Sequence, residues 1–191
     1  MVKAVQKRTL ETRAKLVAAA EEIIAAEGYS AMRVEQVVQK AGVAKGTFFA
    51  HFADKDALMD RIIGARIDAC LDDIDKLSTP KNVESLVSHL MPLLHLMTCE
   101  RYVFDVIVRH SGAAAKEEIG AIAQTFGRQI EVVARWLEDG PFRNDVPAEL
   151  LADGVQAFSV QAMALHFCAV NNEQAMPARL TTYLDAWLNP R

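Results

Sequence analysis

The sequence predicts an all-α protein of about nine helices. Apolar residues recur at three- and four-residue spacing along almost the whole chain of 191 residues, and no segment alternates apolar and polar residues as a half-buried strand does. Glycine and proline are sparse. No run reaches the eighteen uncharged apolar residues of a membrane span, and no apolar stretch of a signal peptide follows the basic amino terminus. A soluble, cytoplasmic protein without a membrane partner is expected.

Four helices are expected in the first 77 residues. Residues 9–27 place Leu16, Ala20 and Ile23 on one face, and Gly28 ends this helix because glycine readily adopts the left-handed conformation needed there. A second, short helix over residues 34–41 ends in the same way at Gly42. The third and fourth helices are expected at about 45–52 and 54–77.

The remaining 120 or so residues are predicted to form five helices. Residues 78–81, Ser-Thr-Pro-Lys, read as the clearest linker. The breaks that follow lie at Ser111-Gly112, between Gly140 and Pro147, and between Asn171 and Pro177. The expected helices span residues 82–98, 100–111, 114–139, 147–171 and 176–188.

The charge is distributed unevenly along the chain. Residues 1–66 contain eleven Lys and Arg against eight Asp and Glu, whereas residues 67–191 contain ten against seventeen, within a net charge of −4. Phosphate neutralisation dominates the affinity of proteins for nucleic acids, so only the amino-terminal part suits a polyanionic partner. An excess of three positive charges over 66 residues is also within ordinary variation.

No residue set predicts catalysis. Nucleophile–base and paired-carboxylate arrangements are lacking, and no cofactor, catalytic residue or metal site is expected. Cys70, Cys99 and Cys168 are widely spaced and suit reduced, buried thiols. His95 and Cys99 share a helix face, and His166 and Cys168 lie two residues apart, so a metal- or redox-responsive regulator and an all-helical enzyme stay as alternatives.

The two short helices are typical of a helix-turn-helix. Gly42-Val43-Ala44 joins them, and a three- to four-residue turn containing glycine is the usual connection of that motif, whose second helix enters the major groove of DNA. Gly46, in the first turn of the second helix, lets the backbone approach DNA closely. The residues expected to form the small core are Val34, Val37, Val43, Phe48 and Phe52.

Thr47 and Phe49 are expected to project from this second helix. An exposed Phe49 is costly unless it has a partner such as a thymine methyl group or a sugar. The alternative is that Phe49 belongs to the core. His51 has two interpretations as well, as a phosphate donor or as a polar residue at the edge of a short helix.

The segment EGYSAMRVEQVVQKAGVAKGTFFAHFADKDAL, residues 27–58, resembles the signature of the TetR (tetracycline repressor) family of transcriptional regulators. The resemblance implies a DNA-binding domain over residues 8–68 and a ligand-binding and dimerisation domain over residues 69–191. It places Lys45, Gly46, Thr47, Phe49 and His51 on or beside the recognition helix. It also implies that Lys55 contacts phosphate, that the protein is a homodimer on double-stranded operator DNA, and that a ligand regulates it.

Three positions depart from the family pattern. Arg33, Ala44 and Phe49 stand where threonine, serine and tyrosine are usual, so two helix caps and three hydroxyl groups are missing. Each lost cap costs about 0.5–2 kcal/mol of local helix stability. Arg33 can replace one phosphate contact by a charge-assisted one. Phosphate anchoring is therefore expected to depend on Arg33, Lys45, His51 and Lys55.

The second domain is expected to bind a small apolar or aromatic effector that releases a repressor from a palindromic operator. Its site is predicted beside Met91, His95, Phe104, Met163 and His166, a soft lining with two polar groups. Dimerisation is predicted through the helices that carry Ile122, Phe126, Ile130, Val133, Leu137, Leu151, Val155, Phe158, Ala162 and Leu165. Gly64 in the fourth helix indicates either close packing against the first helix or a point where the helix bends.

Overall fold

The protein is built from helices alone within the part that the structure describes. The computed structural model describes residues 2–111, 119–170 and 173–189, with side chains from residue 7 onward. The helices are α1 (Val2–Glu27), α2 (Val34–Ala41), α3 (Lys45–Phe49), α4 (Lys55–Ile74), α5 (Val83–Met97), α6 (Arg101–His110), α7 (Ala121–Asp139), α8 (Ala148–His166) and α9 (Met176–Leu188). The predicted all-α class is confirmed. None of the described helices is both long and apolar enough to cross a membrane.

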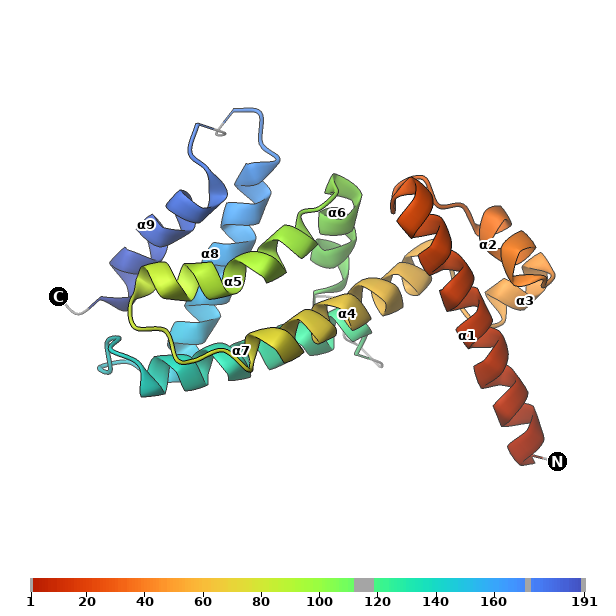
Figure 1. Ribbon diagram of the computed structural model, residues 1–191, viewed down its shortest axis with the longest axis horizontal. Coiled ribbons are helices and arrows are strands. Elements are labelled where there is room, and N and C mark those ends of the chain that lie inside the picture. Colours follow the sequence, from red (N-terminus) through yellow and green to blue (C-terminus); the bar gives the residue numbers. More distant parts are fainter. Residues whose placement is uncertain (1, 112–118, 171–172, 190–191) are drawn as a thin grey trace.

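The molecule is elongated, with α1, α2 and α3 at one end and α5 to α9 at the other (Figure 1). Helix α4 runs from the first group into the second, where it packs along α7. Helix α7 packs in turn on α8, and α8 on α9, while α5 contacts both α4 and α9. Residue 68, the expected domain boundary, lies inside α4, so this helix belongs to both halves of the molecule.

Local signals placed some helix ends well. Helix α2 ends where expected because Gly42 adopts a left-handed φ of 67°, and α9 begins where expected with Pro177 in its first turn. Other ends differ. Helix α1 begins at Val2 rather than residue 9, and α3 ends at Phe49 rather than residue 52. Helix α4 ends at Ile74 and α8 at His166, before the expected residues 77 and 171; residues 114–118 and 171 lie outside the described residues.

Most of the apolar residues predicted for the dimer interface are buried inside the chain. On α7 and α8, side chains such as Ile122, Val133 and Val155 have at most 1% of their surface exposed because α4, α5 and α9 already cover them. Phe158 and Leu165 are only partly buried. The cysteines differ from the expectation too: all three are free, but Cys99 is exposed, and Cys70 and Cys168 are half-buried.

Candidate nucleic-acid interface

Helices α2 and α3 form the predicted helix-turn-helix. The amide of Val43 donates to the carbonyl of Val38 (3.0 Å) beyond the left-handed Gly42, which closes the end of α2 in the manner of a Schellman motif. Val37, Phe48 and Phe52 are buried, with at most 2% exposed. Val34 and Val43 pack against them. The predicted core of this motif is confirmed, and it fixes the angle between the two helices.

Helix α3 presents a mostly exposed surface. Phe49 is 49% exposed and meets Phe48 edge to face, with 5.3 Å between the ring centroids, so it lies outside the core. A Cβ atom added to Gly46 would meet nothing within 4 Å. Packing inside the protein therefore does not require glycine at this position, and the open space suits the approach of another molecule. Lys45 is also exposed, whereas Thr47 is half-buried.

The start of α3 has no side-chain cap, as the residue type of Ala44 predicts. Ala44 has the extended conformation of a cap residue (φ −72°, ψ 151°), but its methyl group accepts no hydrogen bond. The missing cap at Arg33 is handled differently. Gln36 Oε1 accepts from the backbone amide of Arg33 (2.8 Å), and Gln36 Nε2 donates to Glu27 (3.1 Å). Helix α2 is thus stabilised at its start. In the first turn of α3 the amide of Thr47 donates to the carbonyl of Ala44 (2.9 Å), while the amides of Lys45 and Gly46 stay available to an anion.

Two cations lie near each other beside this surface. Burial lowers the pKa of Lys55, and the positive charge of Arg33 lowers it further. The Nζ atom of Lys55 lies 4.4 Å from the ring centroid of Tyr102. Neither cation has a carboxylate within 4.0 Å among the described residues. An anion between them would relieve their repulsion.

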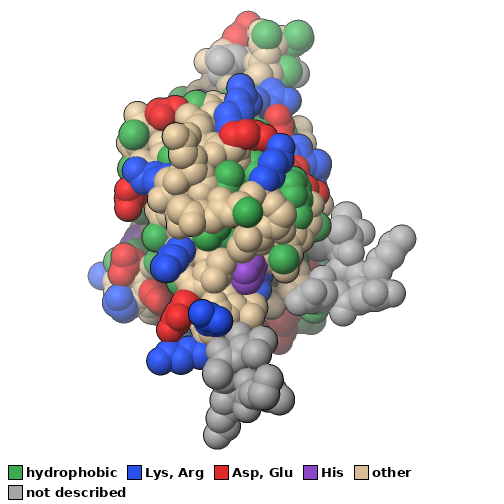
Figure 2. Space-filling view, turned by 90° about the vertical axis from the view of Figure 1, so that its right-hand side faces the viewer, with side chains coloured by type: hydrophobic (Ala, Val, Ile, Leu, Met, Phe, Trp, Pro, Cys, Tyr) green, Lys and Arg blue, Asp and Glu red, His purple; other side chains and the backbone are tan. Residues whose placement is uncertain are grey.

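Lys45 and His51 have other neighbours. Lys45 Nζ pairs with Glu35 at 2.6 Å, but both side chains are more than half exposed, and such a pair contributes only about 0–1 kcal/mol. Lys45 can therefore exchange Glu35 for a phosphate at little cost. His51 is half-buried after α3 and lines a cavity together with Arg13. On the end of the molecule formed by α1 to α3, Lys and Arg side chains are interspersed with Asp and Glu side chains, hydrophobic side chains and uncharged surface (Figure 2).

Three carboxylates that the sequence did not reveal connect this motif to the second half of the molecule. Glu100 accepts from the backbone amides of Tyr29 (2.7 Å) and Ser30 (3.0 Å), in the loop between α1 and α2. Partial burial disfavours the charged form of Glu100, but the two amides outweigh burial and lower its pKa. Gly28 is needed there, because its φ is +87° and a Cβ atom would lie 2.9 Å from Glu100 Oε1.

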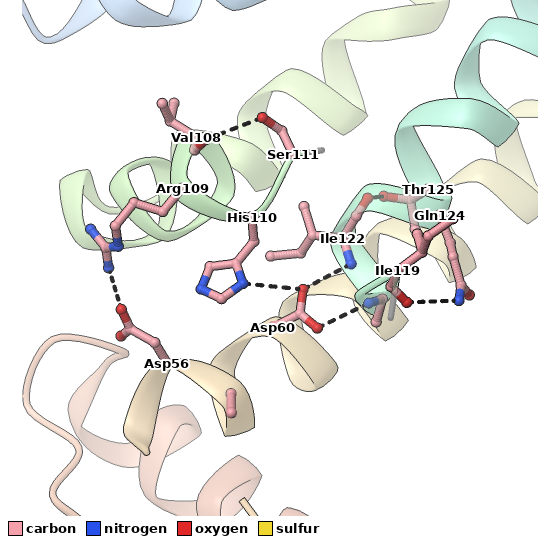
Figure 3. A network of polar contacts seen from close by, with 12 residues as sticks. Asp56, Asp60, Val108, Arg109, His110, Ser111, Ile119, Ile122, Gln124 and Thr125 are labelled. Carbon is pink, nitrogen blue, oxygen red and sulfur yellow. Dashed lines mark hydrogen bonds and ion pairs between the residues drawn. The ribbon is translucent and has the colours of Figure 1, made fainter. Parts of the chain in front are cut away.

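The other two carboxylates lie on α4 (Figure 3). Asp56 accepts from Arg109 (2.7 Å) and from the hydroxyl of Tyr102 (3.0 Å), both on α6. Burial raises the pKa of Tyr102, and so does this hydrogen bond. Asp60 accepts from the amides of Ala121 (2.9 Å) and Ile122 (3.0 Å) and so caps the start of α7. These contacts join residues 46–71 positions apart, and local sequence gives no signal for such pairs.

Gly64 lies where α4 crosses the start of α7. A Cβ atom at this position would lie 2.6 Å from Ala121 Cβ, 2.7 Å from its carbonyl carbon and 2.9 Å from the amide nitrogen of Ile122. Close packing therefore explains the glycine. The expected partner was the first helix, and this was wrong, because the helix that packs against Gly64 is α7. The approach of the two backbones allows Asp60 to reach the amides of α7.

The five residues predicted to bind an effector are not gathered around one described cavity. Phe104 and Met163 are buried and Met91 is half-buried, but His95 and His166 are exposed. Phe104 and His166 both contact Phe167, at centroid distances of 5.7 and 5.1 Å. No group of three or more His, Cys, Asp or Glu among the described residues is placed to hold a metal ion.

His89 on α5 is a polar residue that no sequence pattern indicated. Its Nδ1 atom is buried without a hydrogen-bond partner, and its ring lies 5.4 Å from that of Trp136, centroid to centroid. A buried polar atom without a partner costs about 1–3 kcal/mol. No motif indicates this residue. A histidine at an apolar position of a helix is usually a core residue whose nitrogen atoms have hydrogen-bond partners.

Comparisons with known proteins agree with this geometry. Residues 16–62 match the family model of bacterial regulatory proteins of the tetR family. An uncharacterized HTH-type transcriptional regulator, YvdT of Bacillus subtilis (strain 168), is 30% identical over 109 residues. The match covers 56% of this chain and 56% of YvdT, so the chain matches only about half the length of this relative.

Two solved structures share the fold over nearly the whole chain. RolR in complex with resorcinol has a TM-score of 0.71 at 15% identity, covering 97% of this chain and 91% of its own. FadR of Thermus thermophilus, a TetR family transcriptional repressor in complex with lauroyl-CoA, has a TM-score of 0.67 at 17% identity and 92% coverage of both chains. The helix-turn-helix in residues 34–49 lies inside the segment that matches the tetR family model, so residues 16–62 are a DNA-binding segment of the tetR family type. The two solved structures share the fold of nearly the whole chain.

Proposed function

We propose that this protein is a DNA-binding transcriptional regulator, a repressor that a small molecule releases from a palindromic operator. The exposed surface of α3 carries the proposal. Gly46 leaves room for the close approach of another molecule. Phe49 is exposed although no contact inside the protein requires an aromatic side chain there, and no side chain caps the first amides of the helix. A phosphate group and a base edge with a thymine methyl satisfy these features together.

Arg33 and Lys55 are the proposed phosphate anchors, with Lys45 as a third. The charge of Arg33 acts on Lys55, which Asp56 and Glu100 offset in part, and neither cation forms a described ion pair, so a phosphate close to both would reduce their repulsion. Lys55 stands in the first turn of α4, which follows α3 directly. His51 has a weaker claim, because it is half-buried beside Arg13.

Lys55→Ala tests this assignment through the salt dependence of DNA binding. Losing one phosphate contact in each subunit is expected to lower the slope of log K against log salt concentration by about 0.9 per contact. The slope is measured with a random-sequence 30-base-pair duplex, so no operator is required. Lys81→Ala is the matched control, since Lys81 is exposed in the connection between α4 and α5. An unchanged slope in Lys55→Ala would remove Lys55 from the interface.

The proposed operator requires two copies of the helix-turn-helix, with half-sites about 34–36 Å apart. We assign the dimer interface to the free faces of α8 and α9. Phe158 contacts Tyr183 and Trp187 at centroid distances of 5.4 and 5.9 Å, and all three are half-buried. Leu150, at the start of α8, is 53% exposed. This half-buried aromatic cluster and the exposed Leu150 supply the apolar surface of the proposed interface.

Light scattering at micromolar concentration is expected to give a dimer. Leu150→Glu is expected to shift it towards the monomer, because it places a charge in the proposed interface. Val108→Glu, on α6, is a matched control: Val108 is 46% exposed but lies outside α8 and α9. A monomeric wild-type protein would contradict the proposal, and so would dissociation of both variants alike.

The proposed effector is a small apolar or aromatic compound held in the second half of the molecule. Phe104 and Met163 supply buried apolar side chains to this half. The unpartnered Nδ1 atom of His89, beside Trp136, is a polar group in the same half that a ligand could satisfy. RolR with resorcinol and FadR with lauroyl-CoA are relatives in fold whose ligands have an aromatic ring or a long acyl chain. The exposed His95 and His166 would join such a site only if the helices around them moved.

The switch requires that the effector bind two conformations with different affinities. Helix α4 has 20 residues and a length of about 30 Å, so it reaches from the DNA-binding surface into the second half. Asp56 and Asp60 tie it to α6 and α7. Titrating DNA complexes with resorcinol-like and acyl compounds tests the switch: a compound that binds the protein tightly without changing its affinity for DNA would contradict it.

A further inference from the structure

A cavity of about 500 Å³ lies at the junction between the DNA-binding helices and the rest of the protein. We call it the joint cavity. It is bounded by α1, by the turn after α3, by the first half of α4, by the end of α6 and by the start of α7. Its lining residues are Arg13, His51, Phe52, Ala53, Ala57, Asp60, Arg61, His110, Ile119, Gly120, Ala121 and Gln124. Its volume lies in the range of sites for small organic molecules, about 300–1,000 Å³.

Positive charge dominates this lining. Two guanidinium groups, Arg13 and Arg61, face a single carboxylate, Asp60, and the imidazoles of His51 and His110 complete the polar lining. That carboxylate is already engaged, because its two oxygens accept from the amides of Ala121 and Ile122, and His110 Nδ1 lies 3.9 Å away (Figure 3). The cavity therefore has more cationic groups than its own acid can neutralise.

The two arginines have no carboxylate partner within the described chain. Arg13 lies over the ring of Phe52, 5.1 Å from its centroid, and no described ion pair includes Arg13 or Arg61. Arg61 also lines the two neighbouring cavities, between α1 and α4. By contrast, Arg128, beside one of these cavities, is held by Asp68 and Asp72 at 2.5 Å each. Free guanidinium groups bind carboxylates and phosphates strongly, often through two hydrogen bonds.

The lining also has an apolar part, beside the polar Gln124. Phe52, Ala53, Ala57 and Ile119 provide hydrocarbon surface on both sides of the junction. We propose that the joint cavity binds a small organic anion, with its carboxylate or phosphate group on Arg13 and Arg61 and its apolar body against Phe52 and Ile119. This site is separate from the effector site proposed around Phe104 and Met163, none of whose residues line the joint cavity.

A ligand in the joint cavity would connect the two halves of the protein. Arg13 and His51 belong to the DNA-binding helices, whereas His110 and Ile119 belong to the second half, and Arg61 lies on the helix that both share. Such a ligand stabilises the relative orientation of the halves seen here, so it is expected to change the affinity for DNA even though it does not contact DNA.

The test uses three probes of one size with the full chain at constant ionic strength: benzoate, phenyl phosphate and the neutral benzamide. Titration calorimetry is expected to detect binding of at least one anion and none of benzamide. If benzoate binds more tightly than phenyl phosphate, the natural ligand is assigned to the carboxylates. If phenyl phosphate binds more tightly, the natural ligand is assigned to the phosphate esters. Arg61→Gln and Arg13→Gln are each expected to lower the affinity for the anion roughly tenfold. Arg135→Gln, at the far end of α7, is the control and is expected to bind as the wild type does.

Several results would overturn the proposal: no binding of either anion, equal binding of benzamide, or unchanged affinity in both Arg61→Gln and Arg13→Gln. DNA itself is the remaining competitor for these arginines. If Arg61→Gln lowers the salt slope on the random-sequence duplex by about 0.9 per subunit, Arg61 contacts a DNA phosphate and the cavity is part of the DNA surface. An unchanged slope, together with weakened anion binding, supports a separate site whether or not the protein proves to be a repressor.

Discussion

Replacing Gly64 by alanine is expected to destabilise the protein, although alanine favours helices. Alanine gains about 1 kcal/mol over glycine inside a helix. Its Cβ atom would lie 2.6 Å from Ala121 Cβ and 2.7 Å from a backbone carbon, so α4 and α7 must separate by about 1 Å to restore an ordinary contact. Overpacking of this kind costs about 1–3 kcal/mol.

The same movement weakens the cap that Asp60 forms on α7. Its hydrogen bonds to Ala121 and Ile122 are 2.9 and 3.0 Å long, and a helix cap contributes about 0.5–2 kcal/mol. The overpacking and the weakened cap together outweigh the gain in helix propensity. We therefore expect the free energy of unfolding to fall by about 2 kcal/mol. For a chain of this size that loss lowers Tm by about 4–8 °C.

Gly127→Ala is the matched control. Gly127 lies on the same helix as Ala121, but a Cβ atom there meets nothing within 4 Å. This variant is therefore expected to gain up to about 1 kcal/mol. Both are measured by urea unfolding at one protein concentration, because association shifts apparent stability. If Gly64→Ala is stabilised as much as Gly127→Ala, close packing is the wrong explanation, and Gly64 serves as the bending point considered in the sequence analysis.

Two further predictions concern the DNA-binding helices and their attachment. Ala44→Ser restores a cap on α3 and is expected to raise the free energy of unfolding by about 1 kcal/mol; urea unfolding checks it, with Ala44→Val as the control that should not gain stability. Glu100→Gln is expected to cost about 1 kcal/mol at pH 7, because an amide oxygen replaces a carboxylate that accepts from two backbone amides. Since the pKa of Glu100 is lowered from 4.5, its contribution is complete above that pH and is lost as pH falls through the folded pKa, so the gap between wild type and Glu100→Gln should narrow below pH 4 in urea unfolding. If the difference in free energy of unfolding between the two proteins did not change with pH, the charge of Glu100 would not be the source of its contribution to stability.

The sequence predicted the elements whose signals are local. Gly42 marked the end of α2 and Pro177 the start of α9, because the backbone of each residue type restricts or permits one conformation. The spacing of Phe48 and Phe52 likewise placed them in the core and left Phe49 outside. These inferences need no knowledge of what lies across the fold.

The features that escaped prediction depend on which elements meet. Helical spacing groups residues on a face, but it does not say which face another helix covers, so Met163 is buried while His166, one turn later at the end of α8, is exposed. The hydrogen bonds that Asp60 and Glu100 accept come from residues 61 and 71 positions away. Gly64 was recognised as unusual, yet its partner, α7, became known only from the arrangement of the helices.

The contacts of Glu100 and Asp56 bear on the construction of hybrid regulators. A chimaera that exchanges the amino-terminal domain at residue 68 keeps α4 up to that point but brings in a foreign α6, and so it loses Glu100 from the loop at Tyr29 and Arg109 from Asp56. A graft that also carries residues 100–109 retains both attachments. In this protein the exchangeable unit is therefore discontinuous, since the DNA-reading module includes a piece of chain that lies some thirty residues beyond its apparent end.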